Sequence, residues 1–91
     1  MNISLEQINL MKHAIGFTSK KIKRGKYIVW RNYFCSYGKS RDWEQLVELG
    51  FAKKNQREEA IYYFVTEKGM DYIGKIVGAK IIEYIYRKRT A

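Results

Sequence analysis

The apolar residues in the middle of the chain have the spacing of one face of a helix. Trp43, Leu46 and Val47 recur at intervals of three and four, and the positions between them are mostly polar. Gly50 follows at the position where a left-handed residue commonly ends a helix. The pattern therefore predicts a short amphipathic helix over residues 40–49.

Residues 51–65 have the pattern of a β-hairpin. Residues 60–65 combine aromatic and β-branched side chains, and a polar, charged segment at residues 55–59 separates them from residues 51–54. We therefore expect two strands joined by a charged loop, with one face of the second strand on the core.

A long helix is predicted over residues 67–88, after an N-cap at Thr66. Its apolar residues form two stripes. The first consists of Met70, Ile73, Val77, Ile81, Tyr84 and Ile85, and the second of Tyr72, Ile76 and Tyr86. A helix that is apolar on two sides must bury both of them. We therefore expect one stripe to cover the core and the other to form a homodimer through the C-terminal helix.

Two further helices are expected in the N-terminal half. Residues 4–15 begin with Ser4, and Gln7 completes a capping box three residues later. Residues 27–37 are ambiguous, because their β-branched and aromatic content favours a strand, whereas four aromatic residues recur at helical spacing and Gly38 follows as a stop. We interpret this segment as a helix.

Length and composition indicate one small globular domain. The 91 residues contain 46% hydrophobic and 30% charged side chains and no proline, which is typical of a folded chain. We expect a single domain over residues 1–91, of α+β class but mostly helical, with one β-hairpin and a long C-terminal helix. Such a small domain buries only a modest core, and dimerisation would add stability.

Positive charge is concentrated in the first half of the chain. The net charge is +9, and residues 7–41 contain nine basic residues and no acidic one, whereas residues 42–71 contain seven acids and four bases. Five cations lie within residues 20–26, which we interpret as an exposed connection because mutual repulsion keeps such a run solvated. The asymmetry favours a polyanionic partner, since solubility alone requires no segregation of charge.

Few residues could carry catalytic or metal chemistry. Cys35 is the only cysteine and His13 the only histidine, so a zinc site lacks ligands, and no nucleophile–base pair stands out. We therefore expect no enzymatic activity, no catalytic or metal-binding residue and no cofactor. The apolar C-terminal segment is interrupted by charges and falls short of the ~20 residues of a membrane span. Since the N-terminus also lacks a signal-peptide pattern, we expect a cytoplasmic location without membrane contact.

The residues Leu46-Val-Glu-Leu-Gly50-Phe, followed by a hairpin that closes on Tyr63-Phe-Val-Thr66-Glu-Lys-Gly69, resemble winged helix-turn-helix regulators. The multiple-antibiotic-resistance and phenolic-acid-decarboxylase repressor families share this pattern, with Leu where Val65 stands here. The resemblance covers about a third of the chain. Residues 27–66 are also loosely similar to small phage and prophage proteins. The first resemblance implies a winged-helix fold and double-stranded DNA as the partner of a small dimeric transcriptional regulator. The second implies a mobile-element origin and no known activity.

In winged-helix proteins the helix before the hairpin enters the major groove, and the hairpin touches the backbone. The resemblance implies groove contacts by Lys39, Ser40, Arg41 and Gln45, and wing contacts by Lys53, Lys54 and Arg57. Glu44 and Glu48 lie on the exposed side of the same helix and would repel phosphates. We therefore expect loop cations beside the start of that helix to supply much of the attraction. These cations are Lys20, Lys21, Lys23, Arg24 and Lys26.

Two other interpretations remain open. The acids of the helix and the aromatic hairpin also suit a protein–protein interaction module without DNA binding, such as a phage-encoded modulator of a host factor. Alternatively, the cations of residues 20–26 and nearby tyrosines could bind RNA or a single strand, because stacking proteins expose aromatic rings beside cations. Tyr27, Arg31 and Tyr37 are the candidates for that role, although such an aromatic cluster more often forms core.

Overall fold

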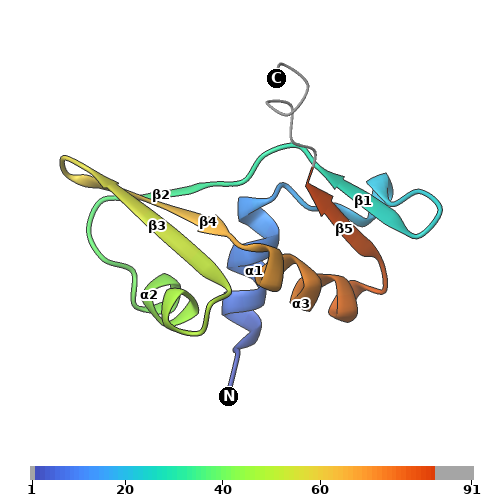
Figure 1. Ribbon diagram of the computed structural model, residues 1–91, viewed down its shortest axis with the longest axis horizontal. Helices are drawn as coiled ribbons and strands as arrows, with labels where there is room; N and C mark the ends of the chain where they lie inside the picture. The colour runs from blue at the N-terminus through green and yellow to red at the C-terminus, as the bar shows by residue number, and fades with distance from the viewer. Residues whose placement is uncertain (1, 84–91) are drawn as a thin grey trace.

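The computed structural model describes residues 2–83, which form three α-helices and five strands (Figure 1). The helices are α1 (Leu5–Ala14), α2 (Arg41–Glu48) and α3 (Glu67–Val77), and a 3₁₀ turn, η1, spans Ser19–Lys21. The strands are β1 (Lys26–Val29), β2 (Phe34–Ser36), β3 (Ala52–Arg57), β4 (Ala60–Val65) and β5 (Lys80–Glu83). Thus α1, α2 and the β3–β4 hairpin occupy the segments that the sequence pattern assigns to them.

Local capping fixes where the helices begin. At α1, the Ser4 hydroxyl accepts a hydrogen bond from the Gln7 backbone N–H at 3.0 Å, and the Gln7 side chain accepts one from the Ser4 N–H at 2.9 Å. Ser40 and Thr66 accept equivalent bonds at the starts of α2 and α3. These caps satisfy backbone N–H groups that have no partner within the helix.

β2, β4 and β3 form an antiparallel sheet with β4 in the centre. Along β4, Ile61, Tyr63 and Val65 are buried, whereas the alternate residues Tyr62 and Phe64 are half-buried. Because successive side chains of a strand point to opposite faces, the sheet has a core face and a second face. We call the face that carries Tyr62 and Phe64 the outer face.

The core lies where the three helices meet the core face of this sheet. Trp43 of α2 is fully buried and stacks between Phe34 and Tyr63, with ring centroids 5.6 and 5.4 Å away. Met11 of α1 and Ile73 of α3 are also fully buried in the same cluster. Burying such large side chains supplies most of the favourable free energy of folding.

Residues 27–37 do not form the predicted helix, because β1, an irregular stretch and β2 occupy them. Trp30 and Tyr33 are 62% and 45% exposed, so the aromatic residues with helical spacing do not share one buried face. The strand preference prevails because Tyr27 and Val29 alternate into the core. The helix that would precede α2 in a helix-turn-helix unit is therefore not formed.

The prediction of a long helix over residues 67–88 is also wrong. α3 ends at Val77 because Gly78 adopts a left-handed conformation (φ 74°), and its N–H donates to the Gly74 carbonyl at 2.9 Å. The chain then turns into β5, where Ile81 pairs with Tyr27 in a parallel ladder with β1. Residues 84–88 of the predicted helix lie outside the described residues.

Residues 2–83 accordingly form an α+β fold with two sheets, and the expectation of a mostly helical fold with a long C-terminal helix is corrected. The two apolar stripes on which the homodimer was predicted therefore do not run along one helix, although Ile76 of the second stripe is exposed on α3. Ile81 of the first stripe is a strand residue, and Tyr72 of the second stacks on Phe51 of the same chain with ring centroids 4.9 Å apart. Tyr84, Ile85 and Tyr86 lie outside the described residues.

Candidate nucleic-acid interface

The cations of residues 20–26 lie on the end of η1 and on the tight, exposed turn that follows it, and we call this segment the basic turn. Lys23 and Lys26 exchange two backbone hydrogen bonds, of 2.8 and 3.0 Å. Arg24 and Gly25 between them both have positive φ, 55° and 75°, which is the backbone of a two-residue hairpin turn of type I′. The turn therefore holds Arg24 at the tip of a short finger with a defined backbone conformation.

The basic turn is anchored to the core through β1. Tyr27 is fully buried, and its hydroxyl donates to the backbone carbonyls of Ile15 and Gly16. Burial raises the pKa of Tyr27 above its ordinary value, so the phenol stays protonated at neutral pH. Lys26 pairs with Lys80 of β5, which adds a sixth exposed cation beside the turn.

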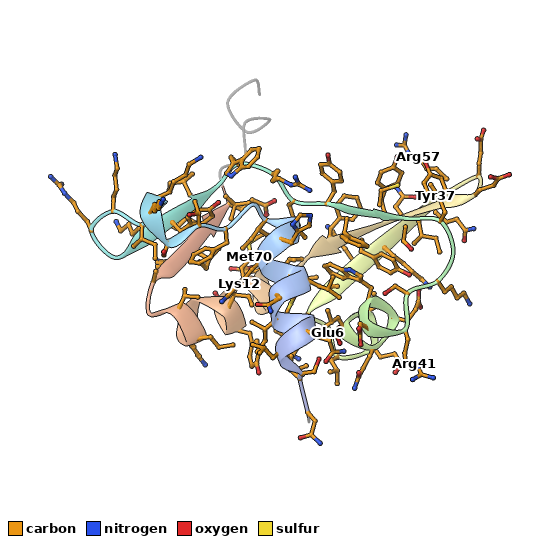
Figure 2. The ribbon with its side chains drawn as sticks, turned by 180° about the vertical axis from the view of Figure 1, so that it is seen from behind. Glu6, Lys12, Tyr37, Arg41, Arg57 and Met70 are labelled. Carbon is orange, nitrogen blue, oxygen red and sulfur yellow. The ribbon has the colours of Figure 1, made fainter. Side chains whose placement is uncertain are left out.

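The basic turn and α2 lie at opposite ends of the molecule (Figure 1). The chain measures 39 Å along its longest axis, and α1 lies between the two elements in this view. Seen from behind, Arg41 and Arg57 are on the side that carries α2 and the β3–β4 hairpin, away from β1 (Figure 2). The expected arrangement, in which the loop cations flank the start of this helix, is therefore not formed.

Three of the residues expected to contact DNA near α2 are engaged within the protein. The Ser40 hydroxyl caps α2 by accepting from the Trp43 N–H at 3.3 Å, and the Gln45 side-chain oxygen accepts from the buried Gln7 amide at 2.8 Å. Lys54 donates to both carboxylate oxygens of Glu44 at 2.8 and 3.0 Å.

Glu44 is therefore not a free charge on the exposed side of α2. Besides Lys54, it accepts a 2.6 Å hydrogen bond from the Tyr63 hydroxyl. The bond from Lys54, followed by that from Tyr63, holds the pKa of Glu44 below its ordinary value. The remaining predicted residues, Lys39, Arg41, Lys53 and Arg57, are all exposed.

The outer face brings together residues that the sequence analysis did not associate. In the β3–β4 ladder, Lys53 lies opposite Phe64 and Asn55 opposite Tyr62, and in the β2–β4 ladder Cys35 lies opposite Tyr62. The residues of β4 are apolar or aromatic at every position and show no alternation in the sequence, so only the structure separates its buried residues from its half-buried ones.

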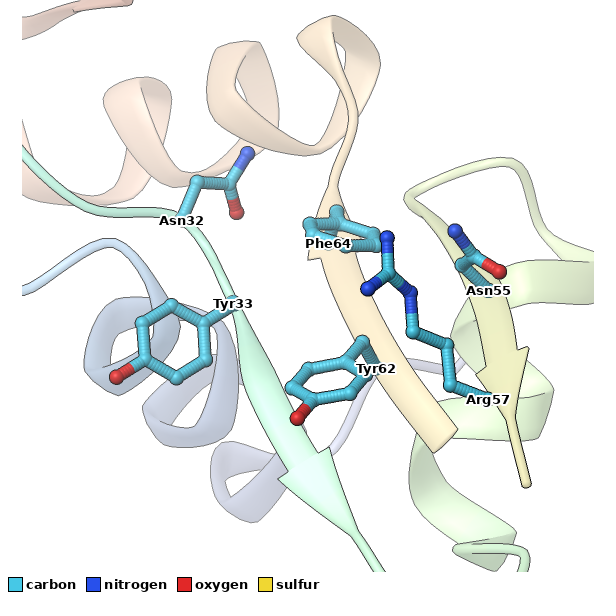
Figure 3. A pocket seen from close by; sticks show the side chains of 6 residues that line it. All are labelled: Asn32, Tyr33, Asn55, Arg57, Tyr62 and Phe64. Atoms are coloured by element: carbon cyan, nitrogen blue, oxygen red, sulfur yellow. The ribbon is translucent and has the colours of Figure 1, made fainter. Parts of the chain in front are cut away.

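A shallow hollow of about 530 Å³ lies on the outer face (Figure 3). Its lining residues combine three aromatic rings with amide and guanidinium groups. They are Asn32, Tyr33, Asn55, Arg57, Tyr62 and Phe64. The interaction with the Cys35 thiol raises the pKa of Tyr62, Tyr37 adds to that rise, and Arg57 opposes it. Cys35 of β2 and Arg57 of β3 therefore both act on the phenol of Tyr62 in β4.

Further exposed aromatic rings continue from the outer face towards the basic turn. The Arg31 guanidinium lies over the ring of Tyr33 at 4.6 Å and within 5.9 Å of the ring of Trp30. Lys21 of the basic turn lies over the same Trp30 ring at 5.4 Å. Aromatic and cationic groups therefore alternate from Tyr33 at the outer face to Lys21 of the basic turn.

Within residues 2–83, no cluster of three or more His, Cys, Asp or Glu side chains could hold a metal ion. The same part of the chain contains no helix that is both long and apolar enough to cross a membrane. Comparison of the chain with protein-family models, curated proteins and solved structures found no match. The resemblance to winged-helix regulators is therefore neither supported nor refuted by these comparisons.

Proposed function

We propose that the chain binds DNA and that the basic turn is its principal contact with the phosphate backbone. The observation that carries the proposal is the conformation of the turn, which holds Arg24 at its tip and Lys23 and Lys26 at its base. All five cations of residues 20–26 are exposed. A preorganised cluster of cations complements the closely spaced phosphates of DNA.

The charge of the basic turn is available to a ligand. The sequence has no acidic residue between positions 7 and 41. Among residues 2–83, the one ion pair within 4.0 Å joins Lys54 to Glu44, which belong to the hairpin and α2. The positive potential is therefore not neutralised locally, and a positive patch of this kind raises the rate at which a polyanion associates.

The proposed contact is chiefly with the DNA backbone. Phosphate contacts fix the position of a protein on DNA but carry no direct sequence information. We therefore expect weak dependence on base sequence and steep dependence on salt. Transcriptional regulation and the homodimer stay predictions from the sequence.

The protein-binding alternative has less support. It relied on the acids of the helix and on the aromatic residues of the hairpin. Of those acids, Glu44 is held by Lys54 and Tyr63. The exposed Glu48 on α2 and Glu58 and Glu59 at the hairpin turn are spread over two elements.

Binding of a short fluorescent duplex, followed by anisotropy from about 50 to about 200 mM salt, tests the proposal. The turn variant Lys23→Gln/Arg24→Gln removes two charges from the basic turn. The matched control Lys39→Gln/Arg41→Gln removes two charges beside the start of α2. We expect the turn variant to lower the magnitude of the log–log salt slope by about two, and the control to leave it nearly unchanged.

Two results would overturn the proposal. Absence of duplex binding by the natural chain at low salt would exclude DNA as the ligand. A larger effect of the control than of the turn variant would transfer the principal contact to α2.

A further inference from the structure

We infer that the outer face of the β2–β4–β3 sheet is a stacking site for an unpaired DNA strand. The inference rests on the proposed DNA binding and names the form of DNA that this second surface takes. Its physical basis is the combination of accessible aromatic rings, neighbouring cations and amide groups on one side of the sheet.

The rings are accessible because the outer face is not part of the core. Tyr62 and Phe64 are half-buried, and Tyr33 and Tyr37 beside them are 45% and 81% exposed. The opposite face of β4 carries Ile61, Tyr63 and Val65, which are buried in the hydrophobic core. The aromatic residues of the outer face are therefore in excess of what packing of the described residues requires.

Cations accompany these rings. Arg57 lines the hollow with Tyr62 and Phe64, Lys53 lies opposite Phe64 across the ladder, and Arg31 lies over Tyr33. No carboxylate lines the hollow. An adjoining hollow shares Asn32, Asn55 and Phe64 with this one and is lined by Lys53 and Lys54 but also by Glu67 and Glu83. An anionic chain is therefore favoured on the Tyr62 side, where no carboxylate lines the surface.

This combination favours an unpaired strand over a duplex. Bases in a duplex are stacked on each other and paired, so their flat faces cannot reach protein rings. An unpaired base can stack on Tyr or Phe while cations contact its phosphate, and each such stack strengthens binding without requiring a particular sequence. Asn32 and Asn55 add amide groups that can hydrogen-bond the edge of a splayed base.

The outer face also differs from a typical protein-docking patch. Protein interfaces are enriched in aromatic residues and arginine but depleted in lysine, whereas the outer face places Lys53 opposite Phe64. An anionic, ring-bearing polymer matches both kinds of group at once. The positive charge of Arg31, Lys53 and Arg57 beside these rings therefore favours a nucleic-acid strand as the occupant.

The test uses the full chain and three labelled probes: an oligothymidylate, a duplex of the same length and an oligouridylate. Tyr62→Leu removes an aromatic ring from the outer face and keeps an apolar side chain in the strand. Tyr72→Leu is the matched control, because Tyr72 is also a half-buried tyrosine but belongs to α3 and stacks on Phe51. Circular dichroism of each variant establishes that it is folded.

We expect Tyr62→Leu to weaken oligothymidylate binding at least about fivefold and to leave duplex binding within about twofold of the natural chain. The control should leave both affinities nearly unchanged. Quenching of tyrosine fluorescence by oligothymidylate should decrease in Tyr62→Leu.

The failure of this inference is distinguishable from the failure of the proposed function. Equal single-strand affinity of Tyr62→Leu and the natural chain would overturn the stacking site, while the effect of the Lys23→Gln/Arg24→Gln variant on the duplex would still support the basic turn. Equal loss of affinity for the single strand and for the duplex would show that the outer face does not select unpaired DNA.

Tighter binding of oligouridylate than of oligothymidylate would overturn the assignment to DNA. Loss of single-strand binding in Tyr62→Leu without any effect of the turn variant would instead overturn the proposed function.

Discussion

The hydroxyl of Tyr63 donates a 2.6 Å hydrogen bond to the carboxylate of Glu44 and thereby joins the centre of the sheet to α2. Tyr63 is fully buried, and its oxygen also accepts a 3.3 Å bond from the backbone N–H of Ser40. Lys54 completes the arrangement from β3. A single buried phenol therefore links the N-terminal end of α2 to the hairpin.

Removal of this hydroxyl should destabilise the fold. In Tyr63→Phe, Glu44 loses one donor and the Ser40 N–H loses its acceptor, while the ring still stacks on Trp43. We expect the free energy of unfolding to fall by about 1–2 kcal/mol, measured by urea denaturation. The control Tyr62→Phe removes a hydroxyl from the outer face and should change the free energy of unfolding by less than about 0.5 kcal/mol. Equal stability of Tyr63→Phe and the natural chain would show that the bond contributes nothing.

Acid should weaken the contact between α2 and the hairpin. Lys54 first, and Tyr63 second, hold the pKa of Glu44 below its ordinary value of 4.5. A depressed carboxyl pKa contributes stability that is present above the unfolded-state value and is lost as pH falls through the folded-state value. The window therefore lies below pH 4.5.

The measurement is the free energy of unfolding from neutral pH into this window. Because the side chains of Lys54 and Glu44 are 37% and 28% exposed, we expect their pairing to contribute less than about 1 kcal/mol. The loss in acid should be smaller in Lys54→Gln than in the natural chain. Glu48→Gln, which changes an exposed carboxylate of the same helix, should leave the acid-dependent loss unchanged. An identical pH profile in Lys54→Gln would contradict the assignment of the shift to Lys54.

Asn32 should be important for the end of the central strand. Its side chain donates to the Val65 carbonyl at 2.9 Å and accepts from the Val65 N–H at 2.8 Å, so it pairs with β4 as a backbone residue of β2 would. Asn32→Ala leaves both groups of the buried Val65 without these partners, and we expect a loss of about 1–3 kcal/mol in the free energy of unfolding. Asn55→Ala, at an exposed position of β3, is the control. Similar stabilities of the two variants would argue against the bridging role of Asn32.

Signals confined to a few neighbouring residues were sufficient for part of this fold. The Ser4–Gln7 capping box, the apolar spacing around Trp43 and the β-rich run of residues 60–65 all gave elements that the structure contains. Each depends on contacts within one turn or one strand, so the sequence pattern carries the necessary information.

Conflicting local signals could not be resolved in the same way. Residues 27–37 combine strand propensity with helical spacing of aromatic rings. Whether residues 26–29 form a strand depends on pairing with β5, which is distant in the sequence and places Ile81 opposite Tyr27. The helical spacing of apolar residues after Thr66 also continues past Gly78, although the left-handed backbone of Gly78 ends α3. A short apolar run such as residues 81–82 fits either period, and its tertiary partner determines which one forms.

The same division applies to the candidate site. The sequence by itself determined that cations are segregated into residues 7–41 and that the β-branched and aromatic residues 60–65 favour a strand, since both are properties of residue order. Tertiary structure alone decided that the basic turn and α2 lie at opposite ends, that Glu44 is paired with Lys54, and that Tyr62 and Phe64 share a face with Lys53 and Asn55. Which charged and aromatic groups meet depends on how distant segments pack, because the free energy of packing is gained only when those segments come together.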